Sequence, residues 1–233
     1  MSTVYLVPSL LHEEGTNALP AYLMDHVKRC AVIFAENERT TRRFLKKLDP
    51  TIIIDQFEWF TIDKGKSSHL SVFRKKVKEE KNIAIISEAG CPGIADPGQE
   101  LISIAQQLNC TVKPLVGPSS ILLALMASGM NGQQFEFLGY LPIPSNERDK
   151  KIREMDELVR RTGVTKIFIE TPYRNNQLLD SLLTNCNAQT LLCIGMNITG
   201  PDERIITKPV SEWKKHKPEL HKIPVIFLLG KTN

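Results

Sequence analysis

The chain has 233 residues, of which 42% are hydrophobic, 24% charged and 6% aromatic. This composition is typical of a globular protein and excludes a disordered, collagen-like or coiled-coil chain as the dominant state. At about 150 residues per domain the length allows one large domain or two small ones. The net charge of +4 is compatible with an anionic partner but does not require one.

Short apolar or β-branched runs alternate with helical patterns along the chain. Strands are predicted at residues 4–7, 31–35, 83–87, 111–115, 135–138, 166–169, 191–196, 204–207 and 224–229. Helices are predicted at residues 20–29, 40–48, 70–80, 99–108, 121–128, 147–161, 174–185 and 211–216. Alternation of strands and helices favours parallel sheets with helices on their faces.

A loop-like stretch over Val116–Ser120 is the candidate connection between two domains. We therefore predict an N-terminal α/β domain over residues 1–117 with a mainly parallel sheet. A C-terminal α/β domain over residues 118–233 is expected to have a mixed sheet, since its later strands include a possible antiparallel hairpin across Thr199–Asp202.

Several classes of site and location are disfavoured by the sequence. The five cysteines form no Cys-x-x-Cys pair and the five histidines form no His-Glu-x-x-His motif. We therefore expect no metal site and a reducing cytoplasmic location. No basic region precedes the first apolar run, and the apolar runs fall far below the ~20 residues that span a bilayer, so neither a signal peptide nor a membrane partner is expected.

The Gly- and Pro-rich loop over residues 87–98 follows a buried-looking strand and leads into a helix. Ligands of open α/β sheets bind outside the carboxyl ends of strands, and twelve residues exceed the usual ~2–6 of such a connection. We favour a binding loop over a tight structural connection. The glycine spacing does not match a dinucleotide fingerprint, and Gly230-Lys231-Thr232 does not form a Walker site. Cys91 in this loop is read as a small pocket residue, with a nucleophile as the remote alternative.

Five basic residues fall at the spacing that places them on one face of a helix: Arg39, Arg42, Arg43, Lys46 and Lys47. No acidic residue lies among them. A phosphate-facing surface and an ordinary solvated face remain equally open.

Glu36 and Glu170 each end an apolar strand. A carboxylate at the end of a strand in an α/β sheet points toward the ligand crevice, where it could orient a substrate or act as a base. The alternative is helix capping or an ion pair with Arg39 or Arg174, respectively.

The order of several motifs resembles one family over nearly the whole chain. These motifs are Val4-Tyr5-Leu6-Val7-Pro8, Ala35-Glu36-Asn37-Glu38-Arg39, Ser87-Glu88-Ala89-Gly90-Cys91-Pro92, Ala95-Asp96-Pro97-Gly98, Pro114-Leu115-Val116-Gly117-Pro118-Ser119-Ser120, Ala127-Ser128-Gly129, Leu138-Gly139-Tyr140-Leu141-Pro142 and Phe168-Ile169-Glu170-Thr171-Pro172-Tyr173-Arg174. The chain resembles the tetrapyrrole (corrin/porphyrin) methylase superfamily, and within it the small-subunit ribosomal RNA cytidine 2′-O-methyltransferases.

The resemblance implies a two-domain α/β homodimer that binds S-adenosylmethionine in the cleft between its domains. By position, the implied cofactor-binding residues are Pro8, Glu88, Ala89, Gly90, Ile94, Ser119, Ser120, Ile169, Met196 and Asn197. Glu36, Arg39, Glu170 and Arg174 match positions on the substrate side. With the basic helix, the expected substrate-binding residues are Arg39, Arg42, Arg43, Lys46 and Arg174.

The chain departs from the family pattern at four places. Residues Ser9–Gly15 replace the family's Pro-Ile-Gly-Asn-Leu, and Glu88 and Cys91 replace the Asp and Thr of its Asp-Ala-Gly-Thr-Pro loop. Asn197–Gly200 replaces its Glu-Leu-Thr-Lys segment, and its small C-terminal helical domain is expected to be missing after Asn233. These departures affect the identity of the substrate more than the binding of the cofactor.

The resemblance therefore predicts methyl transfer to an RNA 2′-oxygen, with Glu36 or Glu170 as the catalytic base. One alternative is methylation of a tetrapyrrole or another small anionic acceptor. Another is a non-catalytic module that binds S-adenosylmethionine without turnover.

Overall fold

The computed structural model describes residues 2–62, 68–95 and 97–231. Asp96, which belongs to the Gly- and Pro-rich loop, lies outside the described residues. The chain forms two compact units, Met1–Ser119 (unit 1) and Ser120–Asn233 (unit 2). The sequence placed the division after residue 117. Each unit is built around one five-stranded sheet.

Unit 1 alternates strands with helices. In chain order its elements are β1 (Thr3–Val7), η1 (Gly15–Ala18), α1 (Leu23–Val27), β2 (Val32–Ala35), α2 (Glu38–Leu48), η2 (Ile54–Gln56), β3 (Glu58–Thr61), α3 (Ser68–Lys78), β4 (Ile83–Ile86), α4 (Gln99–Gln107) and β5 (Thr111–Pro114). The strand order is β3-β2-β4-β1-β5, and every neighbouring pair is parallel. The predicted parallel sheet is confirmed.

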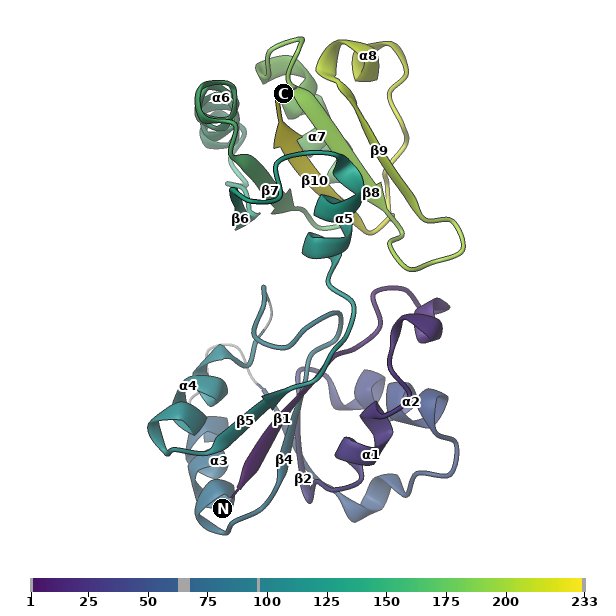
Figure 1. The fold of residues 1–233 in the computed structure, drawn as a ribbon, viewed down its shortest axis with the longest axis vertical. Helices are drawn as coiled ribbons and strands as arrows, with labels where there is room; N and C mark the ends of the chain where they lie inside the picture. Colours follow the sequence, from purple (N-terminus) through teal and green to yellow (C-terminus); the bar gives the residue numbers. More distant parts are fainter. Residues whose placement is uncertain (1, 63–67, 96, 232–233) are drawn as a thin grey trace. The chain divides into compact units, whose positions relative to one another are not determined.

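Helices cover both faces of this sheet. Successive side chains of a strand point to opposite faces, so Ile33 and Ala35 join a core with α1 and α2. Val32 and Phe34 join a second core with α3 and α4. Figure 1 shows α1 and α2 on one side of the strands and α3 and α4 on the other.

The strand β3 was not among the predicted strands. This strand lies at the edge of the sheet and pairs only with β2. Its first and last residues, Glu58 and Thr61, are exposed. With exposed residues at both ends, this four-residue strand lacks the continuous apolar run from which the central strands were predicted.

The described part of unit 2 combines five strands with four α-helices. Its elements are α5 (Ser120–Ser128), β6 (Phe135–Tyr140), α6 (Ser145–Thr162), β7 (Thr165–Ile169), α7 (Asn175–Asn185), β8 (Leu191–Met196), β9 (Arg204–Pro209), α8 (Val210–Lys215) and β10 (Val225–Gly230). The strand order is β6-β7-β10-β8-β9. β6 and β7 are parallel and the other pairs are antiparallel. The predicted mixed sheet is confirmed, as is the hairpin between residues 196 and 204.

One face of the second sheet carries most of the apolar core. Phe168 and Phe227 are fully buried and stack with their ring centroids 5.9 Å apart. They pack with residues of α6, α7 and α8. A Cβ added at Gly195 would lie 2.9 Å from the Cγ2 of Ile226 and 3.1 Å from the Cδ1 of Ile198, so glycine leaves room for these two side chains.

Two further features concern the described part of the chain. None of its helices combines the length and the apolar character needed to cross a bilayer. Its His, Cys, Asp and Glu side chains form no group of three or more that could hold a metal ion.

Candidate functional site

The carboxyl ends of the parallel strands in unit 1 all meet at one edge of the sheet. β1 and β4 are neighbours there, and the helices that follow them, α1 and α4, cover opposite faces. The strand order therefore changes direction between β1 and β4, and open α/β sheets bind ligands at such switch points. The loop after β1 (residues 8–14, the first loop) and the loop after β4 are joined at this point. The backbone N–H of Ser9 donates to the carbonyl of Gly90 (2.8 Å), and the hydroxyl of Ser9 donates to the carbonyl of Ser87 (2.7 Å).

A third loop, after β5, packs against the first. A Cβ at Gly117 would lie 2.2 Å from the Cβ of Pro8, so only glycine fits there. The Sγ of Cys91 lies 3.6 Å from the carbonyl oxygen of Pro118. Gly90 has a φ of +66°, a conformation that favours glycine. Within unit 1 the structure therefore collects Pro8 and Gly90 at one edge of the sheet, together with Glu88 and Ala89.

Glu36 belongs to a small network at the same edge. Its Oε2 accepts a hydrogen bond from the backbone N–H of Glu88 (3.2 Å). The Oε1 of Glu88 in turn accepts from the hydroxyl of Thr40 (3.1 Å) in α2. Asn37 caps α2 by accepting from the backbone N–H groups of Arg39 and Thr40. The network thus connects the end of β2, the start of α2 and the loop after β4.

The basic residues form one face of α2, as their spacing predicted. Thr41 and Leu45 make up the buried side of this helix. The basic side chains nevertheless have different surroundings. Arg42 pairs with Glu38 (2.8 Å) and Asp55 (3.2 Å) and lies 4.7 Å above the ring of Trp59.

The other cations of this face point in different directions. Lys46 donates to the backbone carbonyl of Pro50 (3.1 Å), and Lys47 donates to the backbone carbonyl of Glu13. Arg39 and Arg43 are exposed. The face is therefore divided between a side toward the first loop and a side toward Asp55.

A pocket of about 450 Å³ lies between the first loop, α2 and the loop after β4. Its lining includes three of the predicted site residues, Arg43, Glu88 and Ala89. The other lining residues are Ser9, Leu10, Leu11, His12, Glu13, Thr40, Thr41, Phe44, Lys47 and Ser87. None of these was predicted as a site residue. The available signals were the place of Lys47 on the basic face, of Ser87 at the start of the expected binding loop, and of residues 9–13 in the segment that departs from the family pattern.

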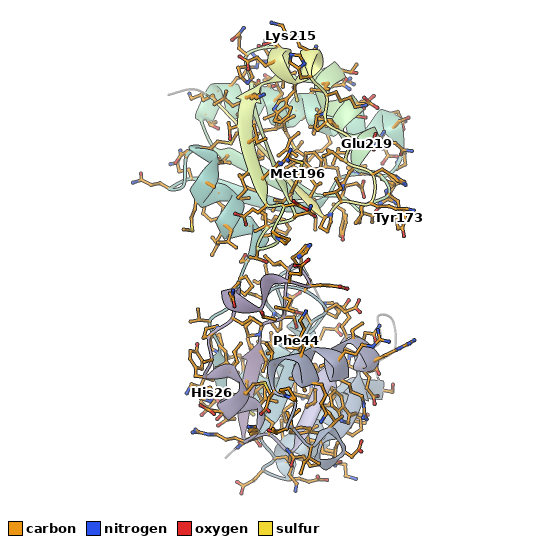
Figure 2. All side chains as sticks on the ribbon, turned by 90° about the vertical axis from the view of Figure 1, so that its right-hand side faces the viewer. His26, Phe44, Tyr173, Met196, Lys215 and Glu219 are labelled. Atoms are coloured by element: carbon orange, nitrogen blue, oxygen red, sulfur yellow. The ribbon has the colours of Figure 1, made fainter. Side chains whose placement is uncertain are left out.

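Unit 2 also collects predicted residues at one edge of its sheet. β7 and β8 are both antiparallel to β10, so their carboxyl ends lie at the same edge. Ile169 pairs with Ile226, and Met196 with Val225. Met196 is labelled in Figure 2.

The loop after β8 has an unusual backbone. Asn197 and Thr199 have φ values of 48° and 70°. A positive φ is a genuine outlier for a β-branched residue such as threonine. The Oγ1 of Thr199 is also buried, with no hydrogen-bond partner in the described part of the chain. Buried polar atoms without partners are rare, so this hydroxyl makes the loop a candidate ligand-facing segment.

Glu170 forms an ion pair with Arg174, which the sequence had left open as the alternative to a role as a base or a substrate-orienting group. Its side chain is 1% exposed, and its Oε1 lies 2.6 Å from the Nη2 of Arg174. The same oxygen accepts from the backbone N–H of Thr171 (2.6 Å) and from the Nε of Arg174 (3.0 Å). Hydrogen bonding to Glu170 raises the pKa of Arg174 above its ordinary value. Of the three remaining predicted positions, Ile94 lies in the loop after β4, Ser119 ends unit 1 and Ser120 begins α5.

Comparison with known proteins identifies relatives along most of the chain. The family described as Tetrapyrrole (Corrin/Porphyrin) Methylases matches residues 16–214. Proteins named ribosomal RNA small subunit methyltransferase I are similar to 90% of the chain at 28% identity in Micromonospora olivasterospora, 90% at 29% in Vibrio cholerae, and 91% at 30% in Bacillus subtilis. The chain covers 64%, 69% and 69% of their respective lengths.

Solved structures show the same fold at lower identity. The methyltransferase CobJ superposes with a TM-score of 0.64 at 14% identity, covering 99% of this chain and 94% of its own. The uroporphyrin-III C-methyltransferase of Thermus thermophilus superposes with a TM-score of 0.59 at 16% identity, covering 98% and 97%. The predicted resemblance is confirmed, and the chain belongs to the tetrapyrrole (corrin/porphyrin) methylase family.

Proposed function

We propose that this protein is an S-adenosylmethionine-dependent methyltransferase that methylates a ribose 2′-oxygen of a cytidine in small-subunit ribosomal RNA. Family membership and the names of the relatives support methyl transfer and this acceptor. The observation that carries the proposal is the network in which Glu36, the loop after β4 and the basic helix α2 are linked by hydrogen bonds.

The residues present fit the donor. In unit 1 the loop after β4 offers backbone polar groups at Glu88–Gly90 and the side chain of Ile94, which is 53% exposed. In unit 2 the orphaned hydroxyl of Thr199 lies two residues beyond Asn197. Apolar surface with a few polar groups is the usual composition of a cofactor site. We propose Pro8, Glu88, Ala89, Gly90, Ile94, Ser119, Ser120, Ile169, Met196 and Asn197 as the donor-binding residues.

The bound donor would supply a methyl group activated by its sulfonium. Because the transfer is a direct displacement, the chain's main task is to align the attacking oxygen with that methyl at about 3 Å. We assign Glu36 as the base that removes the proton of the attacking hydroxyl. Glu170, whose Oε1 is held by Arg174 and Thr171, acts as a positioning group for that arginine on the substrate side.

The direct test uses an extract of cells that lack this protein. Purified protein and donor labelled with tritium in its methyl group are added, and the label is followed into total RNA and into small molecules. We expect label in small-subunit RNA, and nuclease digestion should return it as a 2′-O-methylated cytidine. Label confined to small molecules would identify a tetrapyrrole or other small acceptor, and donor binding without any transfer would identify a non-catalytic module.

Salt dependence separates the two classes of acceptor. Binding through several phosphates weakens steeply as salt rises, because each contact releases a counterion. We expect the affinity for RNA to fall by at least tenfold between ~50 and ~200 mM salt. A small acceptor with few charges would lose much less affinity over the same range.

The proposal includes a homodimer and a cytoplasmic location. Leu122 and Met126, four residues apart on α5, are 52% and 79% exposed and offer an apolar surface to a second copy. Light scattering after size exclusion should give twice the chain mass, and Met126→Glu should shift it toward the monomer. A wild-type monomer at micromolar concentration would contradict the dimer.

A further inference from the structure

The pocket between the first loop and α2 has its own hydrogen-bonding framework. The hydroxyl of Ser9 donates to Ser87, that of Ser87 to Ala89, and that of Thr40 to Glu88. These small polar groups are therefore occupied in holding the walls together. The groups that remain to meet a ligand are the longer side chains of the lining.

Two of these side chains are cations one helical turn apart. Arg43 and Lys47 line the pocket at positions i and i+4 of α2. Like charges at that spacing repel each other, and an anion placed between them would remove the repulsion. Lys47 uses one N–H on the carbonyl of Glu13, and an ammonium group has three donors. The neighbouring cations Arg42 and Lys46 do not line the pocket.

The same pocket has an apolar wall. The side chain of Phe44, labelled in Figure 2, lies on α2 between the two cations in sequence and is half-buried. Leu10 and Leu11 of the first loop also line the cavity. An aromatic ring beside two cations is the arrangement with which proteins stack a nucleobase and hold its phosphate.

His12 adds a polar group from the first loop. Its Nδ1 accepts a hydrogen bond from the backbone N–H of Glu14 (3.2 Å). In the neutral imidazole, the other nitrogen, Nε2, is then the donor. The lining also includes the acidic residues Glu13 and Glu88, and the carboxylate of Glu88 accepts a hydrogen bond from Thr40. The pocket therefore combines two cations, two acidic residues, an aromatic surface and one directed donor.

We propose that this pocket receives one nucleotide of the RNA acceptor, with its phosphate on Arg43 and Lys47 and its base against Phe44. The inference rests on the proposed function and assigns a substrate subsite to it. The pocket volume of about 450 Å³ lies within the 300–1,000 Å³ of ordinary ligand sites. The first loop, where this chain departs from the family pattern, then forms one wall of the acceptor site.

The test titrates the full-length protein with cytidine 3′-monophosphate and with cytidine, following binding by nuclear magnetic resonance. We expect the monophosphate to bind at least tenfold more tightly than the nucleoside. Lys47→Ala and Arg43→Ala should each lower the affinity for the monophosphate about tenfold, as expected for the loss of a charge-assisted hydrogen bond of about 1.5 kcal/mol. Neither substitution should change the affinity for cytidine. Phe44→Leu should weaken both ligands by the same factor.

Controls separate a defined pocket from a diffuse positive field. Lys75→Ala removes an exposed cation on α3, on the other face of the sheet, and should leave both affinities unchanged. Lys46→Ala should cost much less than Lys47→Ala. Equal losses from both lysines would overturn the pocket, as would equal affinities for cytidine and its monophosphate.

Competition identifies the occupant. S-adenosylhomocysteine and cytidine monophosphate should bind together. Displacement of the nucleotide by S-adenosylhomocysteine would assign the pocket to the donor, and displacement by a porphyrin carboxylate would assign it to a tetrapyrrole. Nucleotide binding without RNA methylation would overturn the proposed function and leave the pocket assignment standing, whereas RNA methylation without nucleotide binding would do the reverse.

Discussion

The two units place predicted site residues at one sheet edge by different routes. In unit 1 all strands run in the same direction, so the loops after β1, β2, β4 and β5 meet without further arrangement. In unit 2 the antiparallel strand β10 separates β7 from β8, so β6, β7 and β8 end on one side of the sheet and β9 and β10 end on the other. A parallel sheet thus brings all its strand ends to one edge, while a mixed sheet divides them between two edges.

The two strand-end carboxylates show the same contrast. Glu36 in unit 1 is partly exposed and accepts a backbone N–H from a neighbouring loop. Glu170 in unit 2 is buried and held by an arginine four residues later. Similar sequence contexts have therefore produced two different surroundings, which fit the roles proposed for Glu36 as a base and for Glu170 as a positioning group.

The largest expected effect tests that division of roles. Glu36→Gln should lower the rate of methyl transfer by about 10²–10⁴-fold, the usual contribution of a general base, with donor affinity unchanged. Glu170→Gln should also lower thermal stability, because it weakens the ion pair with Arg174. Labelled-methyl transfer and donor titration are measured on both variants. Undiminished methylation in the double variant would remove both residues from the mechanism.

Core truncation in each unit tests their separate packing. Phe34 packs on Phe60 and Phe73 in unit 1, and Phe168 stacks on Phe227 in unit 2. Phe34→Ala and Phe168→Ala should each cost about 3–5 kcal/mol of unfolding free energy. Hydrogen exchange followed by mass spectrometry should rise mainly in the unit that carries the substitution. An equal rise in both units would show that they unfold together.

A smaller effect is expected at the packed loops of unit 1. Gly117→Ala would place a Cβ against Pro8, and overpacking of this kind costs about 1–3 kcal/mol. Because Pro8 is a proposed donor contact, S-adenosylmethionine affinity should fall with the melting temperature. Gly132→Ala in unit 2 is the matched control, since nothing lies within 4 Å of its added Cβ. Equal behaviour of the two variants would contradict the close packing.

The smallest expected effect concerns acid. Hydrogen bonds from Lys28 and Thr51 lower the pKa of Asp49, at the end of α2, to about 2. A carboxylate with a lowered pKa stabilises the fold above its ordinary value near 4, and this contribution is lost as the pH falls toward 2. Asp49→Asn should therefore flatten the loss of unit 1 stability between pH 4 and 2, as measured by acid titration of circular dichroism. An unchanged acid transition would show that this ion pair is not part of the response.

The central elements were predictable because their signals are local. β8, for example, was predicted at the residues where it occurs, since a buried run bounded by turns specifies a strand. α1 proved shorter than its predicted range of 20–29, because Pro20 and the turn after it precede the helix at Leu23. The exposed edge strand β3 gave no such signal.

The candidate site was only partly predictable for a physical reason. Basic residues on α2 were visible from their spacing, but whether each cation meets an acid, a carbonyl or a pocket depends on segments distant in sequence. Arg42 turns to Asp55, and Lys47 reaches back to Glu13 across 34 positions. Such partners are set by the tertiary fold. The spacing of the basic residues therefore predicted the charged face of α2, but not which partner each cation contacts.

The bond between Ser9 and Gly90 has a consequence for how the pocket beside it can vary. It fixes the start of the first loop to the loop after β4, while residues 10–14 extend beyond that anchor. Residues 10–13 line the pocket, so substitutions there can reshape one of its walls and leave the anchored backbone in place. The shape of the pocket and the position of the loop after β4 can therefore change independently of each other.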